Sequence, residues 1–304
     1  MPSMKNGNLT SPASPSALKS FFLASRPRTW SASLCPVIIG GAIAHFEKPL
    51  YFFITLLFSL FIQIGTNFAN DYFDFIKGTD KPSRMGPKRA TAEGWIAPHA
   101  MLTAALIAFA FDLLIGIPLM IAAGPWSIGL ALLCVFFGIF YTGGPRPFGY
   151  LGLGELFVFP FFGPIATCGT YFLQTQTVTP SVFLASLAPG FLSCAILIAN
   201  NLRDEITDRA AGKRTLVVRF GHAFGAIEYT LAILLASLIP LALVIFAKAP
   251  FNLASASLIF FLALPSITKA FKSKTPIELM PLLPQSSLLL LSYTFLFSIA
   301  AMMN

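Results

Sequence analysis

The sequence predicts an all-α, polytopic membrane protein, a bundle of nine transmembrane helices with its N-terminus in the cytoplasm. Composition, the recurrence of apolar segments and the distribution of Lys and Arg all support this fold class. Hydrophobic residues make up 56% of the 304 residues and charged residues 11%, and the mean hydropathy is +0.77. Soluble domains carry charge on about a quarter of their residues. The composition therefore excludes a soluble domain.

Apolar segments recur along the chain, each close to the roughly 17–25 residues that a membrane-spanning helix needs. The nine expected helices cover residues 30–46, 50–76, 98–123, 125–143, 153–172, 180–202, 222–247, 251–268 and 282–302. Residues 1–20 are rich in Ser, Pro and Asn and lack apolar periodicity, which predicts a disordered cytoplasmic tail. Residues 21–304 are then expected to form a single transmembrane domain.

The positive charges alternate between the two sides of the expected membrane. Of the 20 Lys and Arg residues, 18 fall in the tail and in every second loop, and only Lys48 and Lys248 fall on the other side. Cytoplasmic loops of membrane proteins are enriched in Lys and Arg. The bias predicts a multi-pass protein of the cell (inner) membrane with its C-terminus outside. It also explains the net charge of +8 through the lipid bilayer, without a nucleic-acid partner.

The second expected helix ends in polar residues that a lipid-facing helix would avoid. Asn67, Asp71 and Asp74 share one helical face, and Asn70 lies about 60° from it. A carboxylate at membrane depth costs at least roughly 2.5–3.5 kcal/mol, so it persists where it is paired, hydrated or coordinating. Carboxylate and amide oxygens together suit a hard cation such as Mg²⁺. The alternative is a polar helix end that dips into cytoplasmic water.

The sixth expected helix ends in a matching polar set. Asn200, Asp204 and Asp208 are spaced four residues apart and form a stripe about 80° wide on one face. Asn200 follows Asn67, and Asp204 follows Asp71, by 133 residues in both cases. This spacing indicates a parallel internal repeat of helices one to four and five to eight. Two facing acidic clusters are suited to binding a diphosphate through Mg²⁺, which predicts an active site at the cytoplasmic end of the bundle.

Basic residues beside the two clusters are candidates for binding the diphosphate, although any one of them is equally well explained as an ordinary cytoplasmic-loop residue. These candidates are Lys77, Arg84, Lys88, Arg89, Lys213 and Arg214. Arg146 differs because it is the only charged residue in the short loop 141–147, and it is predicted to be catalytic together with Tyr141. Asp112, alone in the third expected helix, is predicted to form a structural hydrogen bond inside the bundle.

A transporter or channel is the competing functional class, because acids within a membrane also mark ion paths. Transporters usually place their sites near the bilayer midplane, at broken helices. Here the acids lie at one end of their helices, beside basic loops. That arrangement favours an enzyme.

Three segments resemble the UbiA-type intramembrane aromatic prenyltransferases. They are residues 70–74 (Asn-Asp-Tyr-Phe-Asp), 141–147 (Tyr-Thr-Gly-Gly-Pro-Arg-Pro) and 200–215, and the likeness extends from residue 26 to the last expected helix. The resemblance implies that the acidic motifs bind a polyprenyl diphosphate through Mg²⁺. The matching positions are Asn70, Asp71, Asp74, Asp204 and Asp208. One departure is Gly78, where many members of the family carry a third acid.

Within that family, residues 141–147, 152–155 and 211–215 are most similar to the branch that acts on 1,4-dihydroxy-2-naphthoate. The resemblance implies transfer of a polyprenyl group from polyprenyl diphosphate to this acceptor, with loss of diphosphate and CO₂, giving demethylmenaquinone. A prenyltransferase of the same type with a different aromatic acceptor is the alternative.

Overall fold

Helices account for all the regular secondary structure in the part of the chain that the structure, a computed structural model, describes: residues 15–79, 86–273 and 275–303. Each of the nine segments that the sequence predicts to be a helix is mostly helical. The longer α-helices are α2 (Trp30–Ile43), α3 (Pro49–Ile76), α4 (Pro98–Ile115), α6 (Trp126–Phe140), α8 (Ala166–Thr175), α9 (Pro180–Ala210), α11 (His222–Phe246), α12 (Ile259–Lys272) and α14 (Leu282–Met302). The shorter ones are α1 (Ala17–Ala24), α5 (Ile117–Ala123), α7 (Gly154–Pro160), α10 (Leu216–Phe220) and α13 (Pro276–Leu279).

Four further short helical elements are not α-helical. Three are 3₁₀-helices, η1 (Pro27–Thr29), η2 (Phe148–Leu151) and η4 (Phe251–Leu258), and η3 (Phe161–Ile165) is a π-helix.

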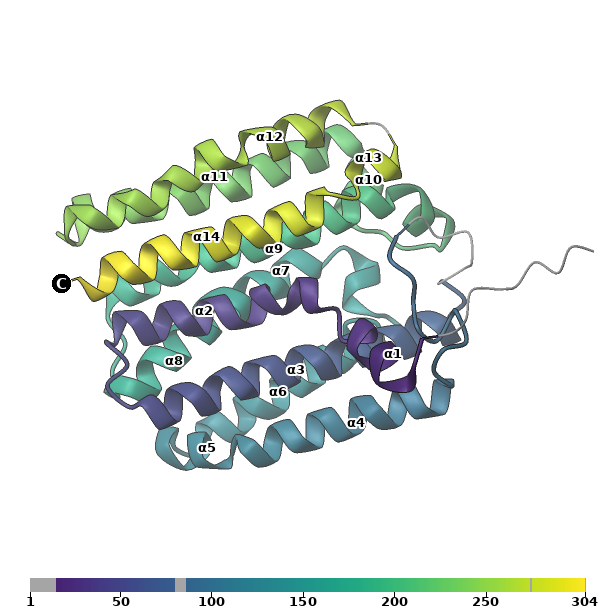
Figure 1. Cartoon of the computed structure of the whole chain (residues 1–304), viewed down its shortest axis with the longest axis horizontal. Helices are drawn as coiled ribbons and strands as arrows, with labels where there is room; N and C mark the ends of the chain where they lie inside the picture. The colour runs from purple at the N-terminus through teal and green to yellow at the C-terminus, as the bar shows by residue number, and fades with distance from the viewer. Residues whose placement is uncertain (1–14, 80–85, 274, 304) are drawn as a thin grey trace, which may run out of the picture.

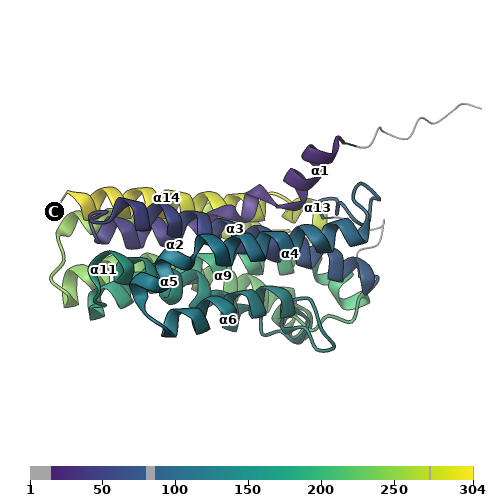
Figure 2. The same cartoon turned by 90° about the horizontal axis from the view of Figure 1, so that it is seen from below.

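Residues 1–14 of the expected tail lie outside the described residues. Figure 2 shows α1, which begins at Ala17, standing out from the end of the bundle. The tail and the boundary at residue 21 stay predictions.

Seven helical stretches within the described residues are long and apolar enough to cross a membrane. They are Pro49–Ile76, Pro98–Ile115, Gly154–Thr175, Pro180–Ala210, His222–Phe246, Phe251–Lys272 and Pro276–Met302. The remaining two expected spans are shorter than the roughly 17–25 residues required, because α2 has 14 residues and α6 has 15. The chain is thus a helical protein with seven candidate spans. The count of nine crossings stays a prediction.

The helices lie side by side along the long axis of the molecule (Figure 1). The C-terminus is at one end of this axis, whereas α1, α10 and α13 are at the other. The long helices α3 and α9, of 28 and 31 residues, both finish at the end that carries α1 (Figure 1). Their polar C-terminal turns therefore lie at the same end of the bundle.

The predicted orientation can be tested by labelling single cysteines in a background in which all four native cysteines are replaced. Ser16 and Met303 are exposed at the two ends of the described chain. With nine crossings, a cysteine at position 16 reacts with an impermeant thiol reagent only from the cytoplasmic side. A cysteine at position 303 then reacts only from outside. Labelling of both positions from the same side contradicts an odd number of crossings.

Two of the expected helices are interrupted, in both cases near proline. The segment 98–123 divides into α4 and α5 at Gly116, two residues before Pro118. Proline lacks an N–H and its ring clashes with the carbonyl four residues earlier, so it breaks or kinks a helix. In the fifth segment, Pro160 directly precedes the π-helical turn η3, and Pro164 lies within it.

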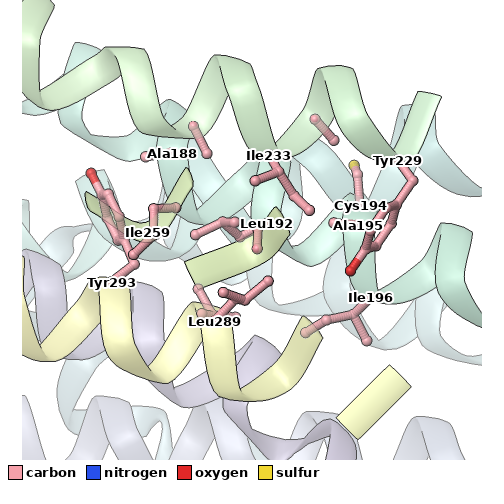
Figure 3. Packing of buried hydrophobic residues seen from close by; sticks show 14 of the residues in the cluster. Ala188, Leu192, Cys194, Ala195, Ile196, Tyr229, Ile233, Ile259, Leu289 and Tyr293 are labelled. Atoms are coloured by element: carbon pink, nitrogen blue, oxygen red, sulfur yellow. The ribbon is translucent and has the colours of Figure 1, made fainter. Parts of the chain in front are cut away.

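The largest hydrophobic core joins α2, α9, α11, α12 and α14. Figure 3 shows Leu192 of α9 beside Ile233 of α11 and Leu289 of α14. The hydroxyl of the fully buried Tyr229 shares a hydrogen bond of 2.9 Å with the hydroxyl of Ser286. A smaller core around Phe68, Met101 and Phe109 joins α1, α3 and α4. Helices of both cores, α2 and α9 from the first and α3 from the second, line a common cavity.

Candidate active site

A cavity of about 380 Å³ lies between α3 and α9, and residues of α2, α5, α6, α7, η3 and α8 form much of its wall. At one end the lining carries acids and amides from the C-terminal part of α3 (Asn67, Asn70 and Asp74) and of α9 (Asn200, Asn201 and Asp208). Farther from these helix ends the lining is mainly apolar and aromatic, and includes Phe58, Met120, Trp126, Phe161 and Phe172. One polar end therefore continues into a long apolar chamber.

Asp74 and Asp208 meet at the polar end of this cavity. Nζ of Lys213 lies 3.3 Å from Oδ1 of Asp208 and 4.0 Å from Oδ1 of Asp74. The guanidinium of Arg89 lies 3.9 Å from Oδ2 of Asp74. The structure thus brings the expected acidic clusters of α3 and α9 together around basic side chains.

Asp71 is buried and lies outside the cavity lining. Its two carboxylate oxygens accept hydrogen bonds from the backbone amides of Ala90, at 3.2 Å, and Thr91, at 3.0 Å. The carboxylate thereby fixes the segment that carries Arg89 against α3. The metal-binding role predicted for Asp71 stays a prediction.

Asp204 is likewise buried and lies outside the lining. Nε and Nη2 of Arg203 donate to its two oxygens, both at 2.7 Å, and Nη2 also donates to Oδ1 of Asn200 at 2.6 Å. A planar guanidinium that binds both oxygens of a carboxylate holds it in a fixed orientation. Asp204 is therefore one half of a buried ion pair, and its predicted metal role is not tested by this geometry.

Asn67 and Asn70 connect α3 to two neighbouring segments. Nδ2 of Asn67 donates to the carbonyl of Ser25 at 2.8 Å and to Oγ1 of Thr29 at 3.3 Å. Oδ1 of Asn70 accepts from the hydroxyl of Thr142 at 2.7 Å. Both amides also line the cavity. They position the α1–α2 connection and the loop after α6 around the polar end.

The basic candidates divide into those at the polar end and those away from it. Lys77 donates from Nζ to the carbonyl of Thr142, and Lys213 and Arg89 line the cavity. Burial lowers the pKa of Lys77; the Asp74 carboxylate opposes this shift and the Lys213 ammonium adds to it. Lys88 instead pairs with Glu93 at 2.9 Å at the surface.

Of the remaining candidate residues, only Tyr141 lines the cavity within the described part of the chain. Arg214 and Arg146 have exposed side chains and lie outside the cavity lining, and Arg84 falls outside the described residues. Tyr141 lines the cavity, and its hydroxyl lies so close to Gly154 that a Cβ atom there would be 3.0 Å away. The structure therefore brings Tyr141 to the site and leaves Arg146 at the surface. The catalytic roles predicted for both residues stay predictions.

Asp112 also departs from its expectation. Its side chain is fully buried, yet both carboxylate oxygens lack a hydrogen-bond partner within the described residues. The structural hydrogen bond predicted for it is not found there.

Tyr150 is a site residue that sequence reasoning did not select. Its hydroxyl donates to Oδ1 of Asp74 at 2.7 Å, and its ring lies beneath the ammonium groups of Lys77 and Lys213, 5.0 and 4.9 Å from the ring centre. The carbonyl of Tyr150 accepts from the backbone amide of Arg214 at 2.8 Å. Tyr150 therefore holds residues from both acidic motifs in one place. Its loop lies far from either motif in sequence, so spacing alone cannot reveal it.

Replacement of Tyr150 should separate these contacts. Tyr150→Phe removes the hydrogen bond to Asp74 but keeps the aromatic face, so we expect turnover to fall about ten- to a hundredfold, as for one hydrogen bond to a charged group. Tyr150→Leu also removes the cation–π contacts and should lower turnover further, by about tenfold or more. Steady-state kinetics on the two variants measure both effects. Equal turnover of the variants and the unchanged chain would show that Tyr150 does not organise the site.

The chain belongs to the UbiA prenyltransferase family. The family matches residues 33–299, which include both acidic motifs and the cavity-lining parts of α3 and α9. The family resemblance found in the motifs is thereby confirmed.

Two curated relatives match nearly the whole chain. The 1,4-dihydroxy-2-naphthoate octaprenyltransferase of Haemophilus influenzae is 33% identical over 304 residues, covering 94% of this chain and 97% of the relative. The protein of the same name from Escherichia coli is 36% identical over 279 residues, covering 86% of this chain and 88% of the relative. The family relationship therefore extends over the length of both proteins.

Solved structures share the fold. A UbiA homolog from Archaeoglobus fulgidus, solved bound to DMAPP and Mg²⁺, superposes with a TM-score of 0.61 over 92% of this chain and 99% of that chain, at 16% sequence identity. At this identity the comparison supports the fold alone. Membership of the family and the apolar helices make this UbiA family member a multi-pass membrane protein.

Proposed function

We propose that this chain transfers a polyprenyl group from a polyprenyl diphosphate to 1,4-dihydroxy-2-naphthoate, with loss of diphosphate and CO₂. The product is demethylmenaquinone, formed first as its quinol. The observation that carries the proposal is the meeting of Asp74 and Asp208 around Lys213 at the polar end of an apolar cavity. The relatives from Haemophilus influenzae and Escherichia coli, whose names give this activity, support the choice of acceptor.

The diphosphate binds at the polar end, where Lys77, Arg89 and Lys213 supply positive charge. Lys213 and Arg89 lie within 4.0 Å of Asp74, so each is already confined to the small volume that the diphosphate would occupy. Positioned cations that neutralise a leaving group stabilise the transition state in a site from which water is excluded. Lys88, Arg84 and Arg214 are assigned a supporting role, in attracting the anion to the cytoplasmic end.

The residues present fit Mg²⁺ as an open site. Within the described residues, no group of three His, Cys, Asp or Glu side chains is arranged to hold a metal ion by itself. Mg²⁺ usually keeps several waters and is bound through one or two carboxylates together with substrate phosphates. Asp74 and Asp208 would supply the carboxylates, beside the amides of Asn70 and Asn200. Bound there, the ion would supply Lewis-acid stabilisation of the diphosphate leaving group.

The apolar chamber holds the prenyl chain and keeps water from the reacting carbon. Phe137 lies with its ring centroid 4.5 Å from that of Phe157 and 5.2 Å from that of Phe161, and all three rings line the cavity. Aromatic faces stabilise a nearby cation by about 0.5–2 kcal/mol each. These rings therefore stabilise the allylic cation as its C–O bond to the diphosphate breaks, and exclude the water that would hydrolyse it.

The acceptor then attacks this cation. The ring carbon that bears the carboxylate forms the new C–C bond, and the electron pair of the bond to the carboxylate restores the aromatic ring as CO₂ leaves. The active end faces the cytoplasm in this proposal, because the basic loops after α3 and α9 lie at that end, and the protein lies in the cell (inner) membrane.

An assay with competing acceptors tests the proposed function. The purified chain, Mg²⁺ and a radiolabelled prenyl diphosphate are incubated with 1,4-dihydroxy-2-naphthoate or with 4-hydroxybenzoate. We expect a prenylated product and released CO₂ with the naphthoate, and at least about a hundredfold less product with the hydroxybenzoate. A product that keeps the carboxyl group, or equal use of both acceptors, contradicts the assigned acceptor.

A further inference from the structure

A second polar group lies deeper in the cavity than the diphosphate end. Asn201 of α9 lines the cavity and is 5% exposed. Its Nδ2 donates to Oε1 of Glu155, at the start of α7, at 3.1 Å. Asn201 precedes Asp208 by seven residues, which places it about 10 Å farther into the bundle along the helix axis. This pair is therefore separate from the acids that flank Lys213.

The carboxylate of Glu155 lies in a setting that disfavours charge. Within the described residues it forms a hydrogen bond to Asn201 and no ion pair with a Lys or Arg side chain. Ionisable groups inside a membrane bundle are costly and are retained mostly where they serve a functional site. Diphosphate binding does not explain Glu155, because a carboxylate without a cation repels an anionic ligand. The pair is better explained by a ligand that donates a hydrogen bond.

The contact fixes how the Asn201 amide is turned. A carboxylate accepts hydrogen bonds, so the –NH₂ group of Asn201 faces Glu155 and its carbonyl oxygen faces the other way. Glu155 itself lies outside the cavity lining, whereas Asn201 belongs to it. The carbonyl oxygen, which has no hydrogen-bond partner within the described residues, is therefore presented to the cavity.

The surroundings suit a hydroxylated aromatic ring. Phe157, two residues after Glu155 on α7, and Phe137 of α6 both line the cavity and pack together at 4.5 Å. The hydroxyl of Tyr141 lies against Gly154, next to Glu155. Planar rings pack well on aromatic walls of this kind. A carbonyl acceptor beside such a wall selects an O–H donor at the edge of the ring.

We propose that Asn201 binds a hydroxyl group of the aromatic acceptor, and that Glu155 is the positioning residue that orients the Asn201 amide. The inference rests on the proposed function, because it assigns the acceptor's place in the same cavity. It explains why the hydroxylated ring enters with its carboxylate-bearing carbon toward the diphosphate end.

Direct binding tests this assignment without turnover. Dissociation constants of 1,4-dihydroxy-2-naphthoate and of 2-naphthoate, which lacks both hydroxyl groups, are measured anaerobically by fluorescence in the presence of Mg²⁺ and an unreactive prenyl thiodiphosphate. Asn201→Leu should weaken binding of the dihydroxy compound about tenfold, the effect of one hydrogen bond. Binding of 2-naphthoate should change less than about twofold. The affinity for the thiodiphosphate should be unchanged.

Two substitutions of Glu155 separate positioning from charge. Glu155→Gln keeps an oxygen that can accept from Asn201, so acceptor affinity should stay within about threefold of the unchanged chain. Glu155→Leu releases the amide and should match Asn201→Leu. Ser193→Ala is the matched control, because Ser193 lines the cavity two turns away on α9. This variant should leave the affinities for both naphthoates unchanged.

Equal weakening of both naphthoates by Asn201→Leu, or no weakening of the dihydroxy compound, overturns the proposal. Should Asn201→Leu fail to fold, the comparison of Glu155→Gln with Glu155→Leu decides it: equal acceptor affinities of these two variants contradict a positioning role. Binding of the naphthoate by the unchanged chain without prenylation would contradict the proposed function instead, and leaves the binding comparison intact.

Discussion

Asp74→Asn and Asp208→Asn should each lower turnover by about a hundredfold or more, equivalent to roughly 2.7 kcal/mol in the activation barrier. The substitution keeps the size and polarity of each side chain but removes a charge that the proposed metal ion requires. Both residues line the cavity, and their carboxylates lie 4.0 and 3.3 Å from the same Lys213 ammonium. An acid that merely packs would show the opposite behaviour, because removal of a buried charge leaves activity intact.

Steady-state kinetics at several Mg²⁺ concentrations measure this effect. Glu205→Gln is the matched control, because Glu205 lies on the same helix between the two acids of the motif, but pairs with Arg209 at 2.7 Å outside the cavity lining. Its turnover should stay within about twofold of the unchanged chain. Activity of the unchanged chain should be lost in EDTA and return with Mg²⁺. Full activity of both Asp74→Asn and Asp208→Asn would show that these two carboxylates do not take part in the site.

Asp71→Leu should destabilise the protein by about 3 kcal/mol or more, because it leaves two buried backbone amides without an acceptor. Those amides, of Ala90 and Thr91, lie 3.2 and 3.0 Å from the carboxylate of Asp71. Release of this segment also displaces the adjacent Arg89 from Asp74, so turnover should fall as well. Asp71→Asn keeps one acceptor oxygen, so its stability should lie between that of the unchanged chain and that of Asp71→Leu.

Unfolding of the detergent-solubilised protein and the Mg²⁺ dependence of turnover distinguish this role from metal binding. An anchoring role predicts a lower unfolding midpoint and an unchanged Mg²⁺ concentration for half-maximal turnover in Asp71→Asn. An unchanged midpoint combined with a raised Mg²⁺ requirement would instead place Asp71 among the metal ligands.

The sequence predicts the helices well because they depend on local patterns, and it predicts the convergence of two acidic helix ends because their matching polar sets lie at the same end of their helices. Apolar length sets the positions of the helices, and the spacing of Asn67, Asp71 and Asp74 on one helix defines a face. The chain folds α3 and α9 against one cavity, so Asp74 and Asp208 meet although they lie far apart in sequence. The break at Gly116 also has a local cause, the nearby Pro118, although it was not predicted.

The sequence does not reveal which acids face the cavity, because the hydrogen-bond partners of each acid in the folded chain decide this. The segment around Ala90 and Thr91 occupies the oxygens of Asp71, and Arg203 occupies those of Asp204. The spacing of acids along a helix carries no information about these partners. Tyr150 reaches Asp74 across 76 residues of sequence for the same reason.

Metal binding at the meeting point of α3 and α9 tests the central claim most directly. Mn²⁺ in place of Mg²⁺ is titrated into the purified protein with an unreactive prenyl thiodiphosphate, and the bound ion is followed by electron paramagnetic resonance. We expect Mn²⁺ to bind with the thiodiphosphate in the unchanged chain and in Glu205→Gln, and to bind at least about tenfold more weakly in Asp74→Asn and in Asp208→Asn. Unaltered Mn²⁺ binding in both variants would contradict a metal and diphosphate site between these two helices.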